Sequence, residues 1–330
     1  MDTKNLVPLL AMPLLLLAVE AGSLLLSLPV KASGVVAFED PTSVANPFIF
    51  IIILLVFTAF LLFLIRYNLK KVLAAIIAVA IFFTFVYIFM AIVYAGMDLT
   101  AAATRSWWDA MVPASVVLSV SAQTLVATVI VFILSLAATI LLYWYPEWYV
   151  IDALGILIGA GVAAIFGASL DVWPVVILLV LLAVYDAISV YKTKHMITLA
   201  EGVVDLKTPI LFVIPKRRDY SFIKEGIGKI SSEDGGSGEG KSERAAFIIG
   251  MGDMIMPSIL VVSANVFLNG WRLGGMVNLP ALGAIAGSLA GIALLMRFVM
   301  SGKPQAGLPP LNGGTILGFL IGYAAMMVVG

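Results

Sequence analysis

The sequence predicts an all-α polytopic membrane protein, with nine transmembrane helices arranged as six plus three. Composition is the first support for this class, because 62% of the 330 residues are hydrophobic and only 12% are charged. An ordinary soluble domain has about 45–50% apolar and about 25% charged residues. A soluble fold of this length would lack the polar side chains to cover its surface. The composition therefore excludes a soluble enzyme, a disordered chain and a nucleic-acid-binding protein.

Long apolar runs are the second support, because a transmembrane helix needs about 20 mostly apolar residues. The predicted spans cover residues 6–28, 47–65, 72–95, 113–143, 149–168, 173–192, 245–267, 276–299 and 308–329. These runs are continuously apolar and do not alternate with polar residues, which excludes a transmembrane β-barrel. The first run has an alternative interpretation as a signal peptide. It is longer than an ordinary signal core, so we predict a retained span.

One long loop, residues 193–244, divides the chain into three parts. Residues 1–192 hold six predicted helices, and residues 245–330 hold the other three. The first part of the loop carries apolar residues, up to Phe212, that can lie on the membrane surface. Residues 231–240 are rich in glycine and serine, a composition typical of a flexible linker.

Basic residues in the loops predict the orientation, since cytoplasmic loops carry more Lys and Arg. The loops on the N-terminal side hold 16 such residues, and the opposite loops hold three; without the long loop the comparison is six against three. We therefore expect a multi-pass protein of the cell membrane, with a cytoplasmic N-terminus and the C-terminus outside. The lipid bilayer is the expected surrounding partner, and a net charge of zero gives no sign of nucleic acid. The oligomeric state stays unknown.

Three acidic residues lie well inside predicted spans, namely Glu20, Asp186 and Asp253. A charge in hydrocarbon costs about 2.5–3.5 kcal/mol on insertion scales, so these residues require an explanation. Asp186 precedes Lys192 by six residues, and Asp253 follows Arg244 by nine residues on the next predicted helix. At about 1.5 Å per residue, the two carboxyls lie about 9 and 13 Å from the same membrane face.

Two carboxyls at similar depth on neighbouring antiparallel helices can share one proton, since both cannot ionise in a low dielectric. The ionised member can activate a water, and the protonated member can donate to a carbonyl oxygen, as in aspartic proteases. Gly250 and Gly252 leave room for another backbone beside Asp253. From these residues alone, three alternatives stay open: a carboxylate-coupled proton or cation transporter, a non-catalytic scaffold, or a packing pair. Glu20 is better explained as a buried, hydrogen-bonded or groove-lining residue than as a catalytic one.

Three motifs resemble those of the presenilin and signal peptide peptidase family of intramembrane aspartyl proteases, above all its archaeal presenilin homologues. They are Tyr185-Asp186 in the sixth span, Gly250-Met251-Gly252-Asp253 in the seventh, and Pro309-Pro310-Leu311 at the start of the ninth. The family pattern has Pro-Ala-Leu at this last place. A literal Pro280-Ala281-Leu282 also occurs, but it opens the eighth span. Order and spacing therefore favour residues 309–311.

The resemblance implies a presenilin-like fold and an endopeptidase that hydrolyses peptide bonds within transmembrane helices of membrane-protein substrates. It implies that Asp186 and Asp253 are catalytic and that an unwound prolyl segment beside them receives the substrate. It implies substrate contacts for Tyr185, Gly250, Met251, Gly252, Pro309, Pro310 and Leu311. Adjacent prolines lack N–H groups and break helical pairing, although the alternative is that they only start a helix. We expect neither a cofactor nor a metal, since the chain has one histidine and no cysteine.

Glycines recur every fourth residue in the last two predicted spans. They are Gly283, Gly287 and Gly291 in the eighth span and Gly314, Gly318 and Gly322 in the ninth. Such a row lines one face of a helix and permits close helix contact. Packing within one chain is favoured over a dimer interface.

Overall fold

The computed structural model describes residues 6–108, 120–193, 211–217, 219–225, 246–299 and 306–329. Its helices are α1 (Leu6–Ser33), α2 (Ala45–Arg66), α3 (Lys70–Trp108), α4 (Val120–Trp144), α5 (Trp148–Ser169), α6 (Val172–Ile188), the π-helical η3 (Ser189–Thr193), α8 (Phe222–Glu225), α9 (Met251–Phe267), α10 (Leu279–Val299) and α11 (Leu308–Val329). Its strands are β1 (Leu211–Pro215), β2 (Ala246–Gly250), β3 (Arg272–Leu273) and β4 (Val277–Asn278). β1 pairs antiparallel with β2, and β3 pairs antiparallel with β4.

Eight helices of the described residues are long and apolar enough to cross a membrane, and α9 is a shorter apolar helix of 17 residues. The eight coincide with predicted spans, which confirms the all-α membrane class. The predicted seventh span, 245–267, needs correction, because residues 246–250 form strand β2 and the helix begins only at Met251. Hydropathy cannot distinguish a short buried strand from a helix, so the sequence pattern does not predict that residues 246–250 pair with β1.

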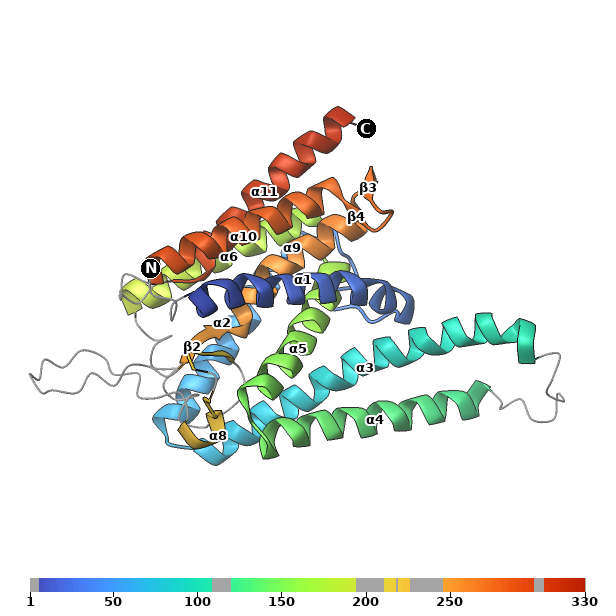
Figure 1. Cartoon of the computed structure of the whole chain (residues 1–330), viewed down its shortest axis with the longest axis horizontal. Helices are drawn as coiled ribbons and strands as arrows, with labels where there is room; N and C mark the ends of the chain where they lie inside the picture. Colours follow the sequence, from blue (N-terminus) through green and yellow to red (C-terminus); the bar gives the residue numbers. More distant parts are fainter. Residues whose placement is uncertain are drawn as a thin grey trace, which may run out of the picture.

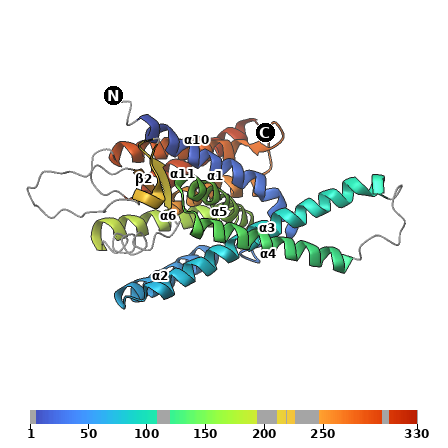
Figure 2. The same ribbon diagram turned by 60° about the horizontal axis from the view of Figure 1, so that its bottom comes forward.

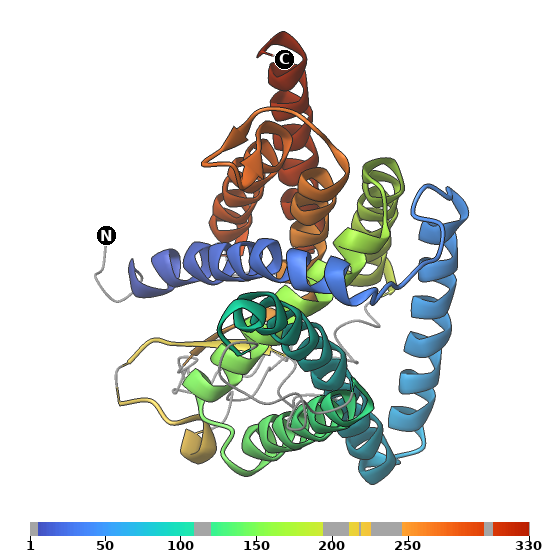
Figure 3. The same ribbon diagram turned by 90° about the vertical axis from the view of Figure 1, so that its right-hand side faces the viewer.

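Helix α1 crosses the middle of the molecule (Figure 3), with α9, α10 and α11 on one side and α3, α4 and α5 on the other. Its Leu16 and Val19 are fully buried in the main core, together with Phe85 of α3 and Leu178 of α6. Helices α3 and α4 form an antiparallel pair that extends to one side of this core (Figures 1 and 2). Helix α2 is mostly exposed and lies beside α6 and α3.

The two rows of glycines face each other, so that α10 and α11 lie in backbone contact along their length (Figure 1). A Cβ atom at Gly287 would collide with the carbonyl oxygen of Gly314, and one at Gly283 would collide with that of Gly318. At the beginning of α11, a Cβ at Gly291 would meet the backbone of Pro310 and Leu311. The expectation that the rows pack within one chain is therefore confirmed.

A polar cluster joins the end of α9 to the beginning of α10. The Asn278 side chain donates to the carbonyl oxygens of Ala264 and Leu268 at 2.7 and 2.9 Å. Its Oδ1 accepts from the Ala281 N–H at 2.9 Å, which caps α10. The literal Pro-Ala-Leu at residues 280–282 is thus the first turn of a capped helix.

Part of the long loop folds back onto the membrane helices. Strand β1 lies against α5, and Phe212 is fully buried, although we expected it on the membrane surface. Glu147 beside α5 accepts hydrogen bonds from Ser221 and the Phe222 N–H at 2.7 and 3.1 Å, which holds α8 in place. The predicted flexible residues 231–240 lie outside the described residues.

We predict that Gly287→Ala lowers the melting temperature, because the added methyl group must force α10 and α11 apart. Overpacking of this kind costs about 1–3 kcal/mol. Gly313→Ala is the matched control, since its Cβ would have open space within 4 Å and alanine favours a helix. A thermal melt in detergent measures both. Equal melting temperatures for the two variants would contradict the close contact.

Candidate active site

Asp186 lies near the end of α6 and is only 7% exposed. Its Oδ2 accepts a hydrogen bond from the backbone N–H of Leu308 at 3.0 Å. The π-helical η3 begins three residues later at Ser189, whose hydroxyl donates to the Asp186 carbonyl at 2.9 Å. Such π-helical insertions are frequent at functional sites. Asp186 is thus held between the end of its own helix and the beginning of α11.

Asp253 lies in the first turn of α9 and is half-buried. The chain reaches it from strand β2 through Gly250, whose backbone is still extended, with φ −63° and ψ 134°. A Cβ atom at Gly307 would lie 2.8 Å from the Oδ2 of Asp253. The carboxyl therefore lies directly against the backbone of Gly307.

The two carboxyl groups converge on one short backbone segment, Ala306–Leu308. Asp186 accepts from Leu308, Asp253 packs on Gly307, and the two carboxyls are close enough to interact electrostatically. The Ala306 N–H donates to the Tyr191 hydroxyl at 3.2 Å, which fixes the other end of the segment. Sequence reasoning missed Gly307; its only signal was a glycine two residues before Pro309.

The third motif differs from the implied unwound segment. Pro309 and Pro310 lie in the first turn of α11, which begins at Leu308. Proline is tolerated there because the first N–H groups of a helix have no intrahelical partner. The non-helical backbone beside the carboxyls is Ala306–Gly307 instead. The implied unwinding at residues 309–311 is therefore wrong, and the alternative that the prolines start a helix is correct.

Of the remaining residues expected at the site, some are accessible at the surface and others are buried in the core. Tyr185 is half-buried next to Asp186, and Gly252 is exposed, with open space where a Cβ atom would lie. Met251 is 5% exposed, and its Cε would meet a Cβ at Gly155, so its side chain packs on α5. Leu311 is 1% exposed and packs in the core beside α10.

Glu20 is fully buried in α1 and accepts a hydrogen bond from the Ser288 hydroxyl of α10 at 2.6 Å. This agrees with the expectation of a buried, hydrogen-bonded residue. Its second oxygen has no partner among the described residues. Among those residues, no cluster of three or more His, Asp or Glu side chains could hold a metal ion.

Comparison with known proteins identifies the family. The model of "Signal-peptide peptidase, presenilin aspartyl protease" matches residues 12–121 and 110–328. Two solved structures of a presenilin family intramembrane aspartate protease, in space groups C222 and P2, are 45% and 46% identical. Each covers 96% of this chain, with 99% and 98% of its own length and TM-scores of 0.63 and 0.62. No curated protein matches. The chain belongs to the presenilin and signal peptide peptidase family and is an intramembrane aspartate protease.

Proposed function

We propose that this protease hydrolyses peptide bonds within transmembrane helices of membrane-protein substrates, with Asp186 and Asp253 as its catalytic pair. One observation carries the proposal: carboxyls from two different helices meet at the segment Ala306–Leu308. Two carboxyls that lie close together share a proton more readily than they both ionise. A packing pair would need no exposed, open position beside it, such as Gly252.

The chemistry follows from the shared proton. The ionised carboxylate takes a proton from a water molecule, whose oxygen attacks the carbonyl carbon of the scissile bond. The protonated carboxyl donates to the carbonyl oxygen and stabilises the charge that develops there. When the tetrahedral species collapses, the carbon–nitrogen bond breaks and the leaving amine takes a proton from the pair. Both carboxyls are needed, since one acts as base and the other as acid.

Substrate binding requires an extended segment, because the amides of a helix are shielded by their own hydrogen bonds. In a membrane, an extended segment must find new partners for its N–H and C=O groups. Strand β2 ends at Gly250, three residues before Asp253, and in the two-stranded sheet it pairs with β1 on one side. Its other edge can add an extended substrate strand. We further propose that Tyr185, Gly250 and Gly252 contact this segment.

The other residues expected to touch the substrate are proposed to act indirectly. Met251 and Leu311 are buried, and Pro309 and Pro310 lie in the first turn of α11. These residues therefore position the backbone that meets the substrate. For orientation, we propose a cytoplasmic N-terminus from the excess of basic residues on that side.

We predict that Asp186→Asn and Asp253→Asn each lower the cleavage of a model transmembrane substrate by at least about a hundredfold, because each removes one of two proton-transfer groups. Cleavage in detergent is measured by mass spectrometry of the products. Asp171→Asn is the control: it lies at the beginning of α6 and caps that helix by accepting from the Val172 N–H. Near-normal turnover of either of the first two variants would exclude a catalytic pair.

We predict that Gly307→Ala abolishes most of the cleavage while the protein stays folded. The new methyl group would lie 2.8 Å from the Asp253 carboxyl and must displace it from the pair. Gly313→Ala, six residues along the same chain segment, adds the same methyl group into open space. The ratio of the two cleavage rates, with a thermal melt of each variant, tests this. Full activity of Gly307→Ala would contradict the role of this segment.

We predict that Leu311→Ala impairs cleavage more than Leu282→Ala does. Loss of a fully buried leucine leaves a cavity and costs about 2–5 kcal/mol, here at the turn that presents Gly307 and Leu308. Leu282 is only half-buried, at the opposite end of α10 from that turn. Rates on one substrate, with melts, give the comparison. The reverse order would move the third motif to residues 280–282.

A further inference from the structure

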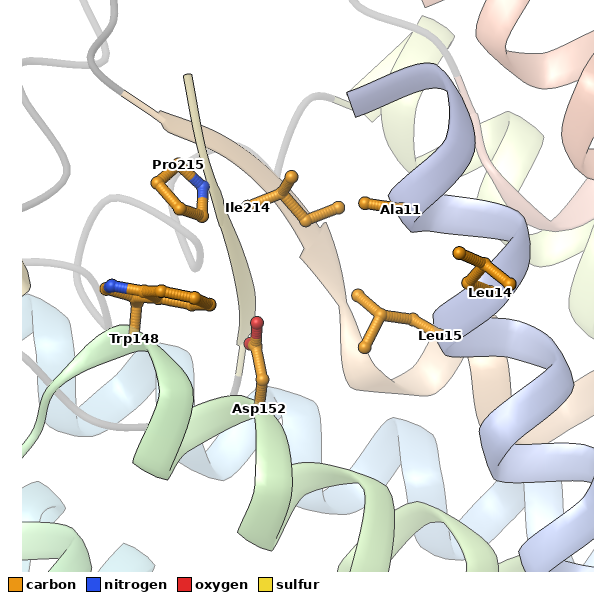
Figure 4. A pocket seen from close by; sticks show the side chains of 7 residues that line it. All are labelled: Ala11, Leu14, Leu15, Trp148, Asp152, Ile214 and Pro215. Atoms are coloured by element: carbon orange, nitrogen blue, oxygen red, sulfur yellow. The ribbon is translucent and has the colours of Figure 1, made fainter. Parts of the chain in front are cut away.

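A third acid, Asp152, has a buried carboxyl that the proposed chemistry does not use. It lies near the beginning of α5 and is 9% exposed. Its Oδ1 accepts a hydrogen bond from the backbone N–H of Val213, in the middle of strand β1, at 2.9 Å. Figure 4 shows the side chain pointing from α5 to this strand, between Trp148 and Ile214.

The hydrogen bond to Asp152 lies on the edge of β1 that faces away from β2. In an antiparallel pair, backbone groups point alternately to the partner strand and away from it. Val213 lies opposite Ile248 of β2, and its N–H goes to Asp152 and thus points away from β2. An added strand would need this central outward donor. Because this donor is already bonded to a buried carboxyl oxygen, strand addition at β1 is blocked.

The same helix also fixes the sheet relative to Asp253. A Cβ atom at Gly155, one turn after Asp152, would meet Phe212 of β1 and Met251, the first residue of α9, at 2.9 and 2.8 Å. Asp152 also lines a pocket of about 330 Å³ with Leu15 of α1, Trp148 and Ile214, and the pocket is otherwise mostly apolar (Figure 4). Burial of a carboxyl among such neighbours costs free energy unless it is hydrogen-bonded, and here the bond from Val213 offsets part of that cost.

We propose that Asp152 is a positioning residue that closes the β1 edge and fixes the strand pair, so that an extended substrate adds only to β2, next to Asp253. The proposal rests on the proposed function, because it concerns how the substrate of that site is aligned. It assigns no proton transfer to Asp152. The residue acts through Val213 and determines which bond of the substrate reaches the catalytic carboxyls.

Three variants test the hydrogen bond from both of its sides. Asp152→Leu removes the acceptor, and Asp152→Asn retains an acceptor oxygen. Val213→Pro removes the donor and keeps the carboxyl, and proline is tolerated where a strand N–H points away from its partner. Glu147→Gln is the matched control, since this acid lies beside the same helix but holds α8. Each variant is assayed for KM, kcat and the set of cleavage positions. Hydrogen exchange of the backbone amides of residues 211–214 is measured in parallel.

We expect Asp152→Leu and Val213→Pro to lower kcat/KM about tenfold, mainly through KM, which is the effect of losing one buried hydrogen bond. Both variants should broaden the cleavage positions, and in Asp152→Leu the amides of residues 211–214 should exchange faster. Asp152→Asn and Glu147→Gln should keep the wild-type product set. An unchanged product set and KM in both Asp152→Leu and Val213→Pro would overturn the proposal. So would an Asn variant as defective as the Leu variant, or lost activity without faster exchange.

The outcome is separable from that of the proposed function. If wild type does not cleave, or Asp253→Asn cleaves normally, the proposed function fails. If wild type cleaves and Asp253→Asn does not, the Asp152 variants alone decide the positioning role. A variant that does not melt cooperatively is replaced by the other member of the hydrogen-bonded pair, which keeps the comparison decisive.

Discussion

The backbone contact between α10 and α11 is the constraint on which the rest of the site depends. Six glycines let the two helices touch without intervening side chains, so the position of α11 along α10 is fixed. The first turn of α11 then falls beside Gly291, and the segment Ala306–Leu308 falls between the carboxyls of α6 and α9. In a membrane, helix association depends on such packing because lipid tails offer no hydrophobic driving force between helices.

Hydrogen bonds hold the α10–α11 pair against the neighbouring helices. Ser288 of α10 bonds Glu20 of α1, and Asn312 of α11 donates to the Leu179 carbonyl of α6 at 3.0 Å. At the other end, Asn278 joins α10 to α9. Each bond leads to a helix that carries, or supports, one of the two aspartates. The relative position of the two carboxyls is therefore set by contacts along whole helices and not by the residues next to the carboxyls alone.

The sequence was sufficient to predict the membrane class, the helix order and the approach of the Asp186 and Asp253 carboxyls to one another. Hydropathy determines the spans, and an acid inside a span is rare enough to indicate a function. It was insufficient for strand β2, because a five-residue apolar strand has the same hydropathy as the start of a helix. Gly307 and Asp152 were missed for a related reason. Their proposed roles depend on contacts with Asp253 and Val213, which are distant in the chain and leave no local pattern. The family match then decides between protease and transporter, which the acids alone left open.

The shortness of α9 has a consequence for the supply of water. A helix of 17 residues rises about 25 Å, which is about 5 Å less than the hydrocarbon core of a bilayer. A span shorter than the local thickness is accommodated by thinning of the bilayer or by polar flanks that reach inward. Here the chain before α9 is strand β2, whose pairing with β1 satisfies the backbone groups on one of its two edges. A short α9 thus favours a thin hydrophobic barrier on the side of Asp253, which lies in its first turn, and so shortens the path of water to that carboxyl.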